Sequence, residues 1–139
     1  MDFMIKVLFL CTGNSCRSQM AEGFLKEYQN FNVHSAGTDP GEMVQPLTVV
    51  VMNELDIDLS LQRPKSVNEF VKDEFDYLIT VCNDAKETCP VFIGKVKHRL
   101  HIGFEDPHGK SIDVFRRVRD EIKKEIDKFA LLVNRDFIK

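Results

Sequence analysis

Cys11 and Arg17 are the two residues of this chain whose types and spacing predict chemistry on an anion. Five residues separate them, and Cys11 comes directly after the apolar run of residues 7–10. A thiolate is a nucleophile, and a guanidinium binds a tetrahedral oxyanion through paired hydrogen bonds. Five residues are enough for the backbone to curl around one such anion with its N–H groups turned inward. The C-x5-R spacing therefore indicates a nucleophile inside an anion-binding loop.

The residues around this pair have the types that such a loop needs. Gly13 and Asn14 tolerate the left-handed backbone of a tight curl, and the Ser18 hydroxyl can hydrogen-bond the thiolate. A helix beginning after the loop would lower the pKa of Cys11 below its ordinary value. The simpler interpretation is an inert buried cysteine near a solvated arginine, but the full CTGNSCRS at a strand-to-helix junction favours the anion site. The residues expected to contact the anion are Thr12, Gly13, Asn14, Ser15, Cys16 and Arg17.

Hydrophobic periodicity predicts the elements that position this loop. Residues 5–10, which are apolar without interruption after Lys6, and the mainly apolar residues 76–82 are typical of strands buried on both faces of a parallel sheet. Residues 112–129 repeat apolar side chains every three or four positions, which predicts a long amphipathic helix. The other predicted elements are a helix over residues 19–29, strands over residues 31–38 and 95–102, and a helix that Pro46 opens. Together they predict an α/β fold in three layers, with a four-stranded, mainly parallel sheet and helices on both faces.

Composition limits the classes of protein to which the chain can belong. Its 139 residues are the size of one domain, and 43% of them are hydrophobic, so we expect a single domain over residues 1–139 and a monomer. A formal net charge of -3 gives no general attraction to nucleic acid or to an anionic membrane. No apolar run reaches transmembrane length, and the run before Cys11 is too short for a secretory signal. We therefore expect a cytoplasmic protein that binds neither nucleic acid nor membrane.

The chain has four cysteines, Cys11, Cys16, Cys82 and Cys89. In a reducing compartment such a set is more often catalytic or metal-binding than a structural disulfide framework. Cys82 ends a predicted strand, so it should lie at the same sheet edge as Cys11, while Cys89 follows on a polar segment. Two other interpretations stay open: Cys82 and Cys89 are inert, or the four cysteines bind zinc. The zinc spacing is looser than that of common knuckles, and Arg17 would repel a cation.

Several motifs resemble those of one known fold family. CTGNSCRS resembles the phosphate-binding loop of the low-molecular-weight protein tyrosine phosphatase fold. The longer FLCTGNSCRSQMAEG, together with HSAGT, DIDLS, GFEDP and RVRDEIK, resembles the thioredoxin-coupled arsenate reductases built on that fold. The resemblance covers nearly the whole chain and is weakest between residues 60 and 72. It implies arsenate as substrate and arsenic detoxification as the role.

The resemblance also implies a relay of thiols. Cys11 attacks arsenic, and Asp106 in EDPHG protonates the departing oxygen. Cys82 then attacks the Cys11 sulfur so that arsenite leaves, and Cys89 finally forms a disulfide with Cys82. Reduced thioredoxin, or a glutaredoxin system, would open that disulfide, and no cofactor stays bound. Cys16 has no part in the relay and is expected to pack inside the loop.

Two alternatives to a reductase remain. A low-molecular-weight protein tyrosine phosphatase shares the first step, so some phosphatase activity is expected in either case. Against it, Gln19 stands where phosphatases of this fold usually carry proline, and DPHG lacks the tyrosines that often follow their Asp-Pro pair. The second alternative is a non-catalytic module that binds metal or thiols.

One position departs from the reductase pattern. Many related reductases hold a potassium ion behind the loop with an Asn, a Glu, a Ser and an Asp. Asn14, Glu22 and Ser35 match the first three, but Lys65 stands at the position of the Asp. We expect Lys65 to replace the cation by pairing with Glu22, so that no potassium is bound. The alternative is a solvated loop lysine.

Overall fold

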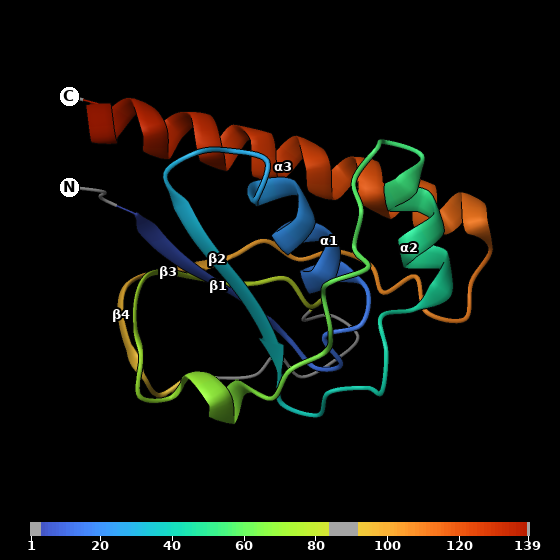
Figure 1. Cartoon of the computed structure of the whole chain (residues 1–139), viewed down its shortest axis with the longest axis horizontal. Helices are drawn as coiled ribbons and strands as arrows, with labels where there is room; N and C mark the ends of the chain where they lie inside the picture. The colour runs from blue at the N-terminus through green and yellow to red at the C-terminus, as the bar shows by residue number, and fades with distance from the viewer. Residues whose placement is uncertain (1–3, 84–91, 139) are drawn as a thin grey trace.

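Four strands form one parallel sheet at the centre of the protein (Figure 1). The computed structural model describes residues 4–83 and 92–138. In spatial order the strands are β2 (Phe31–Gly37), β1 (Ile5–Cys11), β3 (Glu74–Thr80) and β4 (Lys95–His101). Each neighbouring pair is parallel, so the prediction of a four-stranded, mainly parallel sheet is confirmed.

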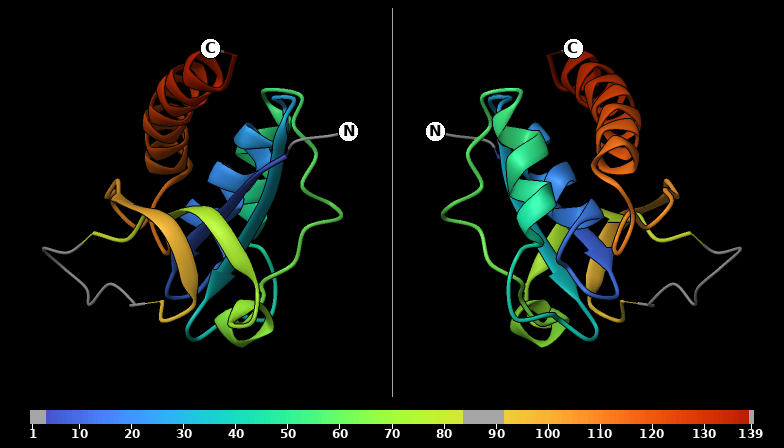
Figure 2. Two further views of the ribbon diagram at one scale, coloured as in Figure 1. Left: turned by 90° about the vertical axis from the view of Figure 1, so that its left-hand side faces the viewer. Right: turned by 90° about the vertical axis from the view of Figure 1, so that its right-hand side faces the viewer.

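Helices cover the two faces of this sheet unequally (Figure 2). The helices α1 (Arg17–Leu25), α2 (Pro46–Asn53) and α3 (Ile112–Ile138) pack on one face and against one another. The short 3-10 helix η1 (Val67–Phe70), which the sequence patterns did not predict, helps to cover the other face. The predicted three-layer α/β architecture is confirmed, with a thick helical layer on one side and a thin one on the other.

The side chains of β1 alternate between these two layers. Val7 and Phe9 join the core that the three α-helices share, whereas Leu8 and Leu10 join the smaller core that η1 closes. Because β1 lies between β2 and β3, both of its faces are buried, as its continuous apolar run predicts. The edge strand β4 is mostly exposed.

The long helix α3 holds α1 against the sheet. Its buried stripe repeats at helical spacing, with members Phe115, Val118, Ile122, Ile126 and Phe129. All nine residues of α1 are buried, because the helix packs against the sheet and α3, and its Gly23 faces Met52 of α2. The position of the α1 N-terminus, to which the predicted anion loop leads, is thereby fixed by packing on several sides.

The end of β3 differs from its prediction. The strand ends at Thr80, so Cys82 lies two residues beyond it and not at its last position. The Val81 N–H still donates to the Leu10 carbonyl at 3.1 Å, but the Val81 carbonyl accepts the Phe104 N–H at 3.2 Å. The chain therefore leaves the sheet after Thr80 to meet the segment that precedes α3.

Helix α1 also begins and ends earlier than predicted. It begins at Arg17 and not at residue 19, and it ends at Leu25 and not at residue 29. The N–H groups of Glu27 and Tyr28 bond to carbonyls three residues back, which tightens the turn. Asn30 then adopts a left-handed φ of 74°, which turns the chain into β2.

The strand order places a crevice at the carboxyl edge of the sheet. The chain continues from β1 to β2 on one side and later to β3 on the other, so the order reverses beside β1. Ligands bind outside such reversal points in open α/β sheets. Cys11, the last residue of β1, lies there. Among the helices in the described ranges, none is both long and apolar enough to span a bilayer.

Candidate active site

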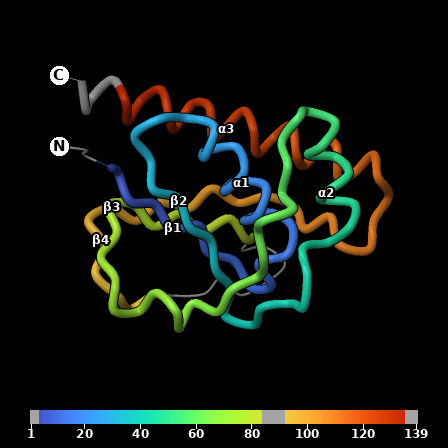
Figure 3. The backbone as a smooth tube through the Cα atoms, viewed as in Figure 1, coloured from blue at the N-terminus to red at the C-terminus, as the bar shows by residue number. Residues whose placement is uncertain are grey.

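The segment that follows β2 runs beside the loop that follows β1 and holds it by backbone hydrogen bonds (Figure 3). The carbonyl oxygens of Thr12, Gly13 and Ser15 each accept an N–H group of the segment 39–45 at 3.0 Å. The C=O and N–H groups of a trans peptide point in opposite directions. These bonds therefore turn the N–H groups of the loop toward the opposite side, where the pocket lies.

Asn14 fixes the curl of the loop from behind. Its φ of 51° is the left-handed conformation predicted for this position. The Nδ2 group donates to Ser18 Oγ at 2.7 Å and to Ser35 Oγ at 2.9 Å, and Oδ1 accepts the Lys65 backbone N–H at 2.8 Å. A side chain held at both ends in this way stabilises a backbone conformation that would otherwise be costly.

Cys11 is the buried nucleophile candidate, with 2% of its surface exposed. Its Sγ lies 2.9 Å from Ser18 Oγ and accepts the Asn14 N–H at 3.2 Å. Burial raises the pKa of the Cys11 thiol, although the Ser18 hydrogen bond, the charge of Arg17 and loop amides act to lower that pKa. The prediction of a lowered pKa is wrong for this structure, because the loss of hydration outweighs the donors around the sulfur.

Arg17 and Asp106 meet across the mouth of the loop. Arg17 Nη2 lies 3.7 Å from Asp106 Oδ2, and Arg17 Nη1 donates to the Phe104 carbonyl at 3.2 Å. The Arg17 side chain is buried, whereas that of Asp106 is 45% exposed. The His108 backbone N–H donates to the other carboxylate oxygen of Asp106 at 3.0 Å. Asp106 is therefore held at the pocket while its carboxylate remains open to solvent and substrate.

These groups line one pocket of about 370 Å³. Every residue from Cys11 to Arg17 contributes to its wall, together with Asp106. Asp39 and His108 also line it. Asp39 was not predicted, because only the backbone ladder between the two loops brings it to the mouth of the pocket. The arrangement can hold a tetrahedral oxyanion against a sulfur nucleophile, with a carboxyl group placed opposite.

The chain matches the family model described as low molecular weight phosphotyrosine protein phosphatase over residues 6–138. The chain belongs to this phosphatase family. It is 46% identical over 127 residues to "Arsenate reductase 1" of Staphylococcus saprophyticus, which covers 90% of this chain and 95% of the relative. Among solved structures, "An arsenate reductase in the phosphate binding state" superposes with a TM-score of 0.79 at 35% identity, over 91% of this chain and 96% of that one.

A phosphatase of the same fold is also similar. The YwlE arginine phosphatase from Geobacillus stearothermophilus has a TM-score of 0.78 at 25% identity and covers 96% of both chains. The low molecular weight phosphatase family thus contains both reductases and phosphatases, and the recognised resemblance to it is confirmed. Which reaction this member performs depends on residues beyond the shared loop.

The two further cysteines of the predicted relay differ in what the structure shows. Cys82 is fully buried, and its neighbour Val81 bonds to Leu10 at the end of β1. Its backbone thus lies at the same sheet edge as Cys11. Cys82 is disulfide-bonded, whereas Cys11 is a free thiol. Cys89 lies outside the described residues.

Cys16, the fourth cysteine, is a buried free thiol in the loop whose pKa burial raises to about 11, consistent with packing. The zinc interpretation involves Cys89, which lies outside the described residues, so the structure does not test it. Within the part of the chain that the structure describes, no three His, Cys, Asp or Glu side chains are grouped so as to hold a metal ion.

Two glutamines behind the loop have a role that sequence patterns did not predict. Gln19 Nε2 donates to the Asn14 carbonyl at 3.0 Å and to the Arg63 carbonyl at 3.0 Å. Gln62 Nε2 donates in turn to Gln19 Oε1 at 2.7 Å. Gln19 is completely buried, and a buried amide needs such partners. The only signal in the sequence was that Gln19 departs from the proline of the phosphatases.

Gly37 lies so close to the loop that no side chain fits. A Cβ atom built on Gly37 would lie 2.3 Å from the Thr12 carbonyl oxygen. The glycine of the HSAGT motif is therefore required by the close approach of β2 to the loop, and not by an unusual backbone angle.

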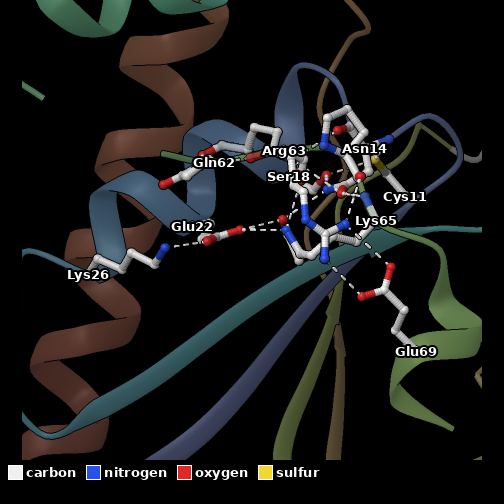
Figure 4. Close-up of polar contacts among 12 residues, drawn as sticks. Cys11, Asn14, Ser18, Glu22, Lys26, Gln62, Arg63, Lys65 and Glu69 are labelled. Carbon is white, nitrogen blue, oxygen red and sulfur yellow. Dashed lines mark hydrogen bonds and ion pairs between the residues drawn. The ribbon is translucent and has the colours of Figure 1, made fainter. Parts of the chain in front are cut away.

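The residues matched to a cation site do lie together behind the loop (Figure 4). The Ser35 hydroxyl donates to Glu22 Oε1 and accepts from Asn14. Lys65 Nζ lies 3.6 Å from Glu22 Oε1, so the predicted ion pair is present. The alternative of a solvated lysine does not describe this side chain, which is 13% exposed.

Proposed function

We propose that this protein is an arsenate reductase that uses Cys11, Cys82 and Cys89 in a disulfide relay. The observation that carries the proposal is the single pocket in which Cys11, Arg17 and Asp106 meet, in a chain 46% identical to an arsenate reductase. The proposed substrate is arsenate, a tetrahedral oxyanion like the phosphate named for a similar reductase structure.

In the first step the Cys11 thiolate attacks arsenic from inside the loop. The loop amides and the Arg17 guanidinium stabilise the charge on the arsenate oxygens. An arsenic–oxygen bond breaks, and the departing oxygen takes a proton from Asp106 and leaves as water. Because the pKa of the buried Cys11 thiol is raised, the thiol passes its proton to the arsenate dianion as the anion binds, and this leaves the thiolate that attacks.

The neighbouring acid is unsuited to the role given to Asp106. Glu105 is paired with Lys110 and Arg117, and these hydrogen bonds lower its pKa to about 2. Glu105 is thus bound to two cations, and it is not among the residues that line the pocket. Asp106, which faces the pocket beside Arg17, is the proposed acid.

The second stage moves two electrons onto arsenic. The Cys82 thiolate attacks the Cys11 sulfur, the sulfur–arsenic bond breaks, and its electron pair reduces As(V) to As(III). Cys89 then attacks the Cys82 sulfur, forms a disulfide with it and releases the Cys11 thiolate. Cys82 is disulfide-bonded while Cys11 is a free thiol. This combination supports the proposed order, because it is the state expected after the last internal step.

An external dithiol must then reopen the disulfide, and we propose thioredoxin, with glutaredoxin as the alternative donor. A cytoplasmic location and a monomeric state remain predictions that accompany this relay. No cofactor is needed for the proposed sequence of bond changes.

The second candidate function is a phosphatase, which the shared pocket and the similarity to an arginine phosphatase favour. It would use the same first step and then let water hydrolyse the cysteinyl-phosphate. We expect weak hydrolysis of aryl phosphates alongside the reductase activity.

The deciding experiment compares wild type with Cys82→Ser in two assays. Wild type should oxidise reduced thioredoxin in an arsenate-dependent manner, and the variant should lose at least about 10²-fold of this turnover because the relay has no second thiol. Hydrolysis of p-nitrophenyl phosphate by the same variant is the control for an intact Cys11 pocket and should persist. A variant that still reduces arsenate would refute the relay, and a wild type active only on phosphate would establish the phosphatase.

Mass spectrometry after one arsenate turnover without reductant identifies the final disulfide. The relay requires Cys82 bonded to Cys89 and Cys11 free. All thiols reduced after the turnover would contradict it.

A further inference from the structure

A cluster of hydrogen-bonded polar side chains lies behind the loop, and of its four members only Asn14 also lines the pocket (Figure 4). Its members are Asn14, Glu22, Ser35 and Lys65. We propose that the Lys65 ammonium is the built-in cation of this cluster, so that the protein binds no potassium ion behind the loop. The inference makes no use of arsenate chemistry and is independent of the proposed function.

Glu22 is the charge that the cluster must neutralise. Its side chain is 5% exposed, and a buried carboxylate is costly unless it is paired and hydrogen-bonded. Its Oε1 accepts the Ser35 hydroxyl and lies 3.6 Å from Lys65 Nζ, while Oε2 is paired with Lys26 Nζ. Both oxygens of the carboxylate are thus already engaged by a cationic side chain.

Lys65 is held by hydrogen bonds at its backbone and at its ammonium group. Its backbone N–H donates to Asn14 Oδ1 at 2.8 Å, and its carbonyl accepts the Gly37 N–H at 2.8 Å. At the other end Nζ donates to the Arg63 carbonyl at 2.9 Å. A lysine anchored at its backbone and at its ammonium places a positive charge at a defined position beside Glu22.

The oxygen atoms of the cluster do not fit a potassium ion. Asn14 Oδ1 already accepts two hydrogen bonds, one from the Lys65 backbone and one from Gln19 Nε2 at 3.1 Å. An amide oxygen has two lone pairs, so none is left for a metal ion. A potassium ion would also be the third cation near Glu22, after Lys26 and Lys65, and their mutual repulsion would oppose its binding.

The ammonium acts on the loop through a chain of hydrogen bonds. Glu22 accepts from Ser35, Ser35 accepts from Asn14, and Asn14 also donates to Ser18. Lys65 is therefore a positioning residue: it fixes Glu22, and Glu22 fixes the orientation of the amide that supports the loop.

The test measures melting temperatures of the purified protein in KCl, NaCl and choline chloride at equal ionic strength. Wild type should melt at the same temperature in all three salts. Lys65→Met should melt about 5 °C lower, because Glu22 loses its buried partner. Lys26→Met is the matched control: it removes the same charge from the same carboxylate, but Lys26 is 46% exposed, so its melting point should fall by less than about 2 °C.

Lys65→Asp is the variant that tests the inference most directly. It removes the ammonium and adds a second carboxylate beside Glu22, so potassium should raise its melting temperature by about 3 °C or more over sodium. A folded variant that is indifferent to potassium would overturn the inference, as would a wild type that potassium stabilises or a Lys65→Met that melts like wild type. If Lys65→Asp does not fold, the wild-type salt series and Lys65→Met still decide the matter.

Discussion

The loop of residues 11–17 has two sides that differ in how tightly they are held. On the pocket side the ion pair between Arg17 and Asp106 spans 3.7 Å, and the Asp106 carboxylate is half exposed. On the opposite side both ends of the Asn14 side-chain amide are hydrogen-bonded. The nitrogen donates to Ser18 and Ser35, and the oxygen accepts from Gln19 and from the Lys65 backbone.

This difference shows which residues fix the geometry of the site. The groups that would touch substrate are left open for it, and much of the shape of the loop is imposed by residues that do not line the pocket, among them Ser35, Gln19 and Lys65. The site is therefore expected to be sensitive to substitutions on its hidden side as well as in the pocket.

The largest expected effect concerns the pocket side and its pH dependence. Burial raises the pKa of Cys11 above its ordinary value near 9, so little thiolate exists in the free protein at pH 7. The rate of Cys11 alkylation by iodoacetamide should rise about tenfold per pH unit from pH 7 to 9. Peptide mass spectrometry follows the reaction at Cys11, with the buried Cys16 as an internal reference. A rate that levels off below pH 8 would mean that the donors around the sulfur outweigh burial.

A smaller effect is expected where β2 approaches the loop most closely, at Gly37. Gly37→Ala places a methyl group 2.3 Å from the Thr12 carbonyl, so the loop must shift. We expect a loss of about 1–3 kcal/mol in the free energy of unfolding and at least a tenfold fall in kcat/KM. The matched control is Gly41→Ala, whose new methyl group meets no atom closer than 3.9 Å. Equal behaviour of the two variants would show that the close approach does not shape the loop.

The smallest expected effect comes from the glutamine pair. Gln19→Met removes a buried amide and leaves the Asn14 carbonyl without that donor, which should cost about 1–2 kcal/mol of unfolding free energy. Gln62→Met is the control, because Gln62 is only partly buried and bonds to Gln19 rather than to the loop. Chemical denaturation followed by circular dichroism measures both. If Gln62→Met cost as much as Gln19→Met, the support of the loop would not depend on its direct donor.

Local patterns were sufficient for much of the fold. The apolar run of β1 and the helical stripe of α3 are signals within one segment, and both elements begin where they were predicted, although α3 continues beyond residue 129 to Ile138. The CTGNSCRS motif likewise predicts its own left-handed turn at Asn14. Where an element ends depends on partners elsewhere, and for this reason the end of β3 and the ends of α1 were misplaced.

The sequence by itself identified Cys11 as the candidate nucleophile, Arg17 as its candidate partner and the strand-to-helix junction that carries them, because these depend on neighbours within one turn of the chain. It also predicted that Lys65 pairs with Glu22. Only the tertiary structure decided that the Cys11 pKa is raised, that Gln19 supports Asn14 and that Asp39 lines the pocket. The burial of Cys11, the backbone bonds between the two loops and the hydrogen bond of Gln19 to the Arg63 carbonyl arise when the layers pack, and no local pattern records them.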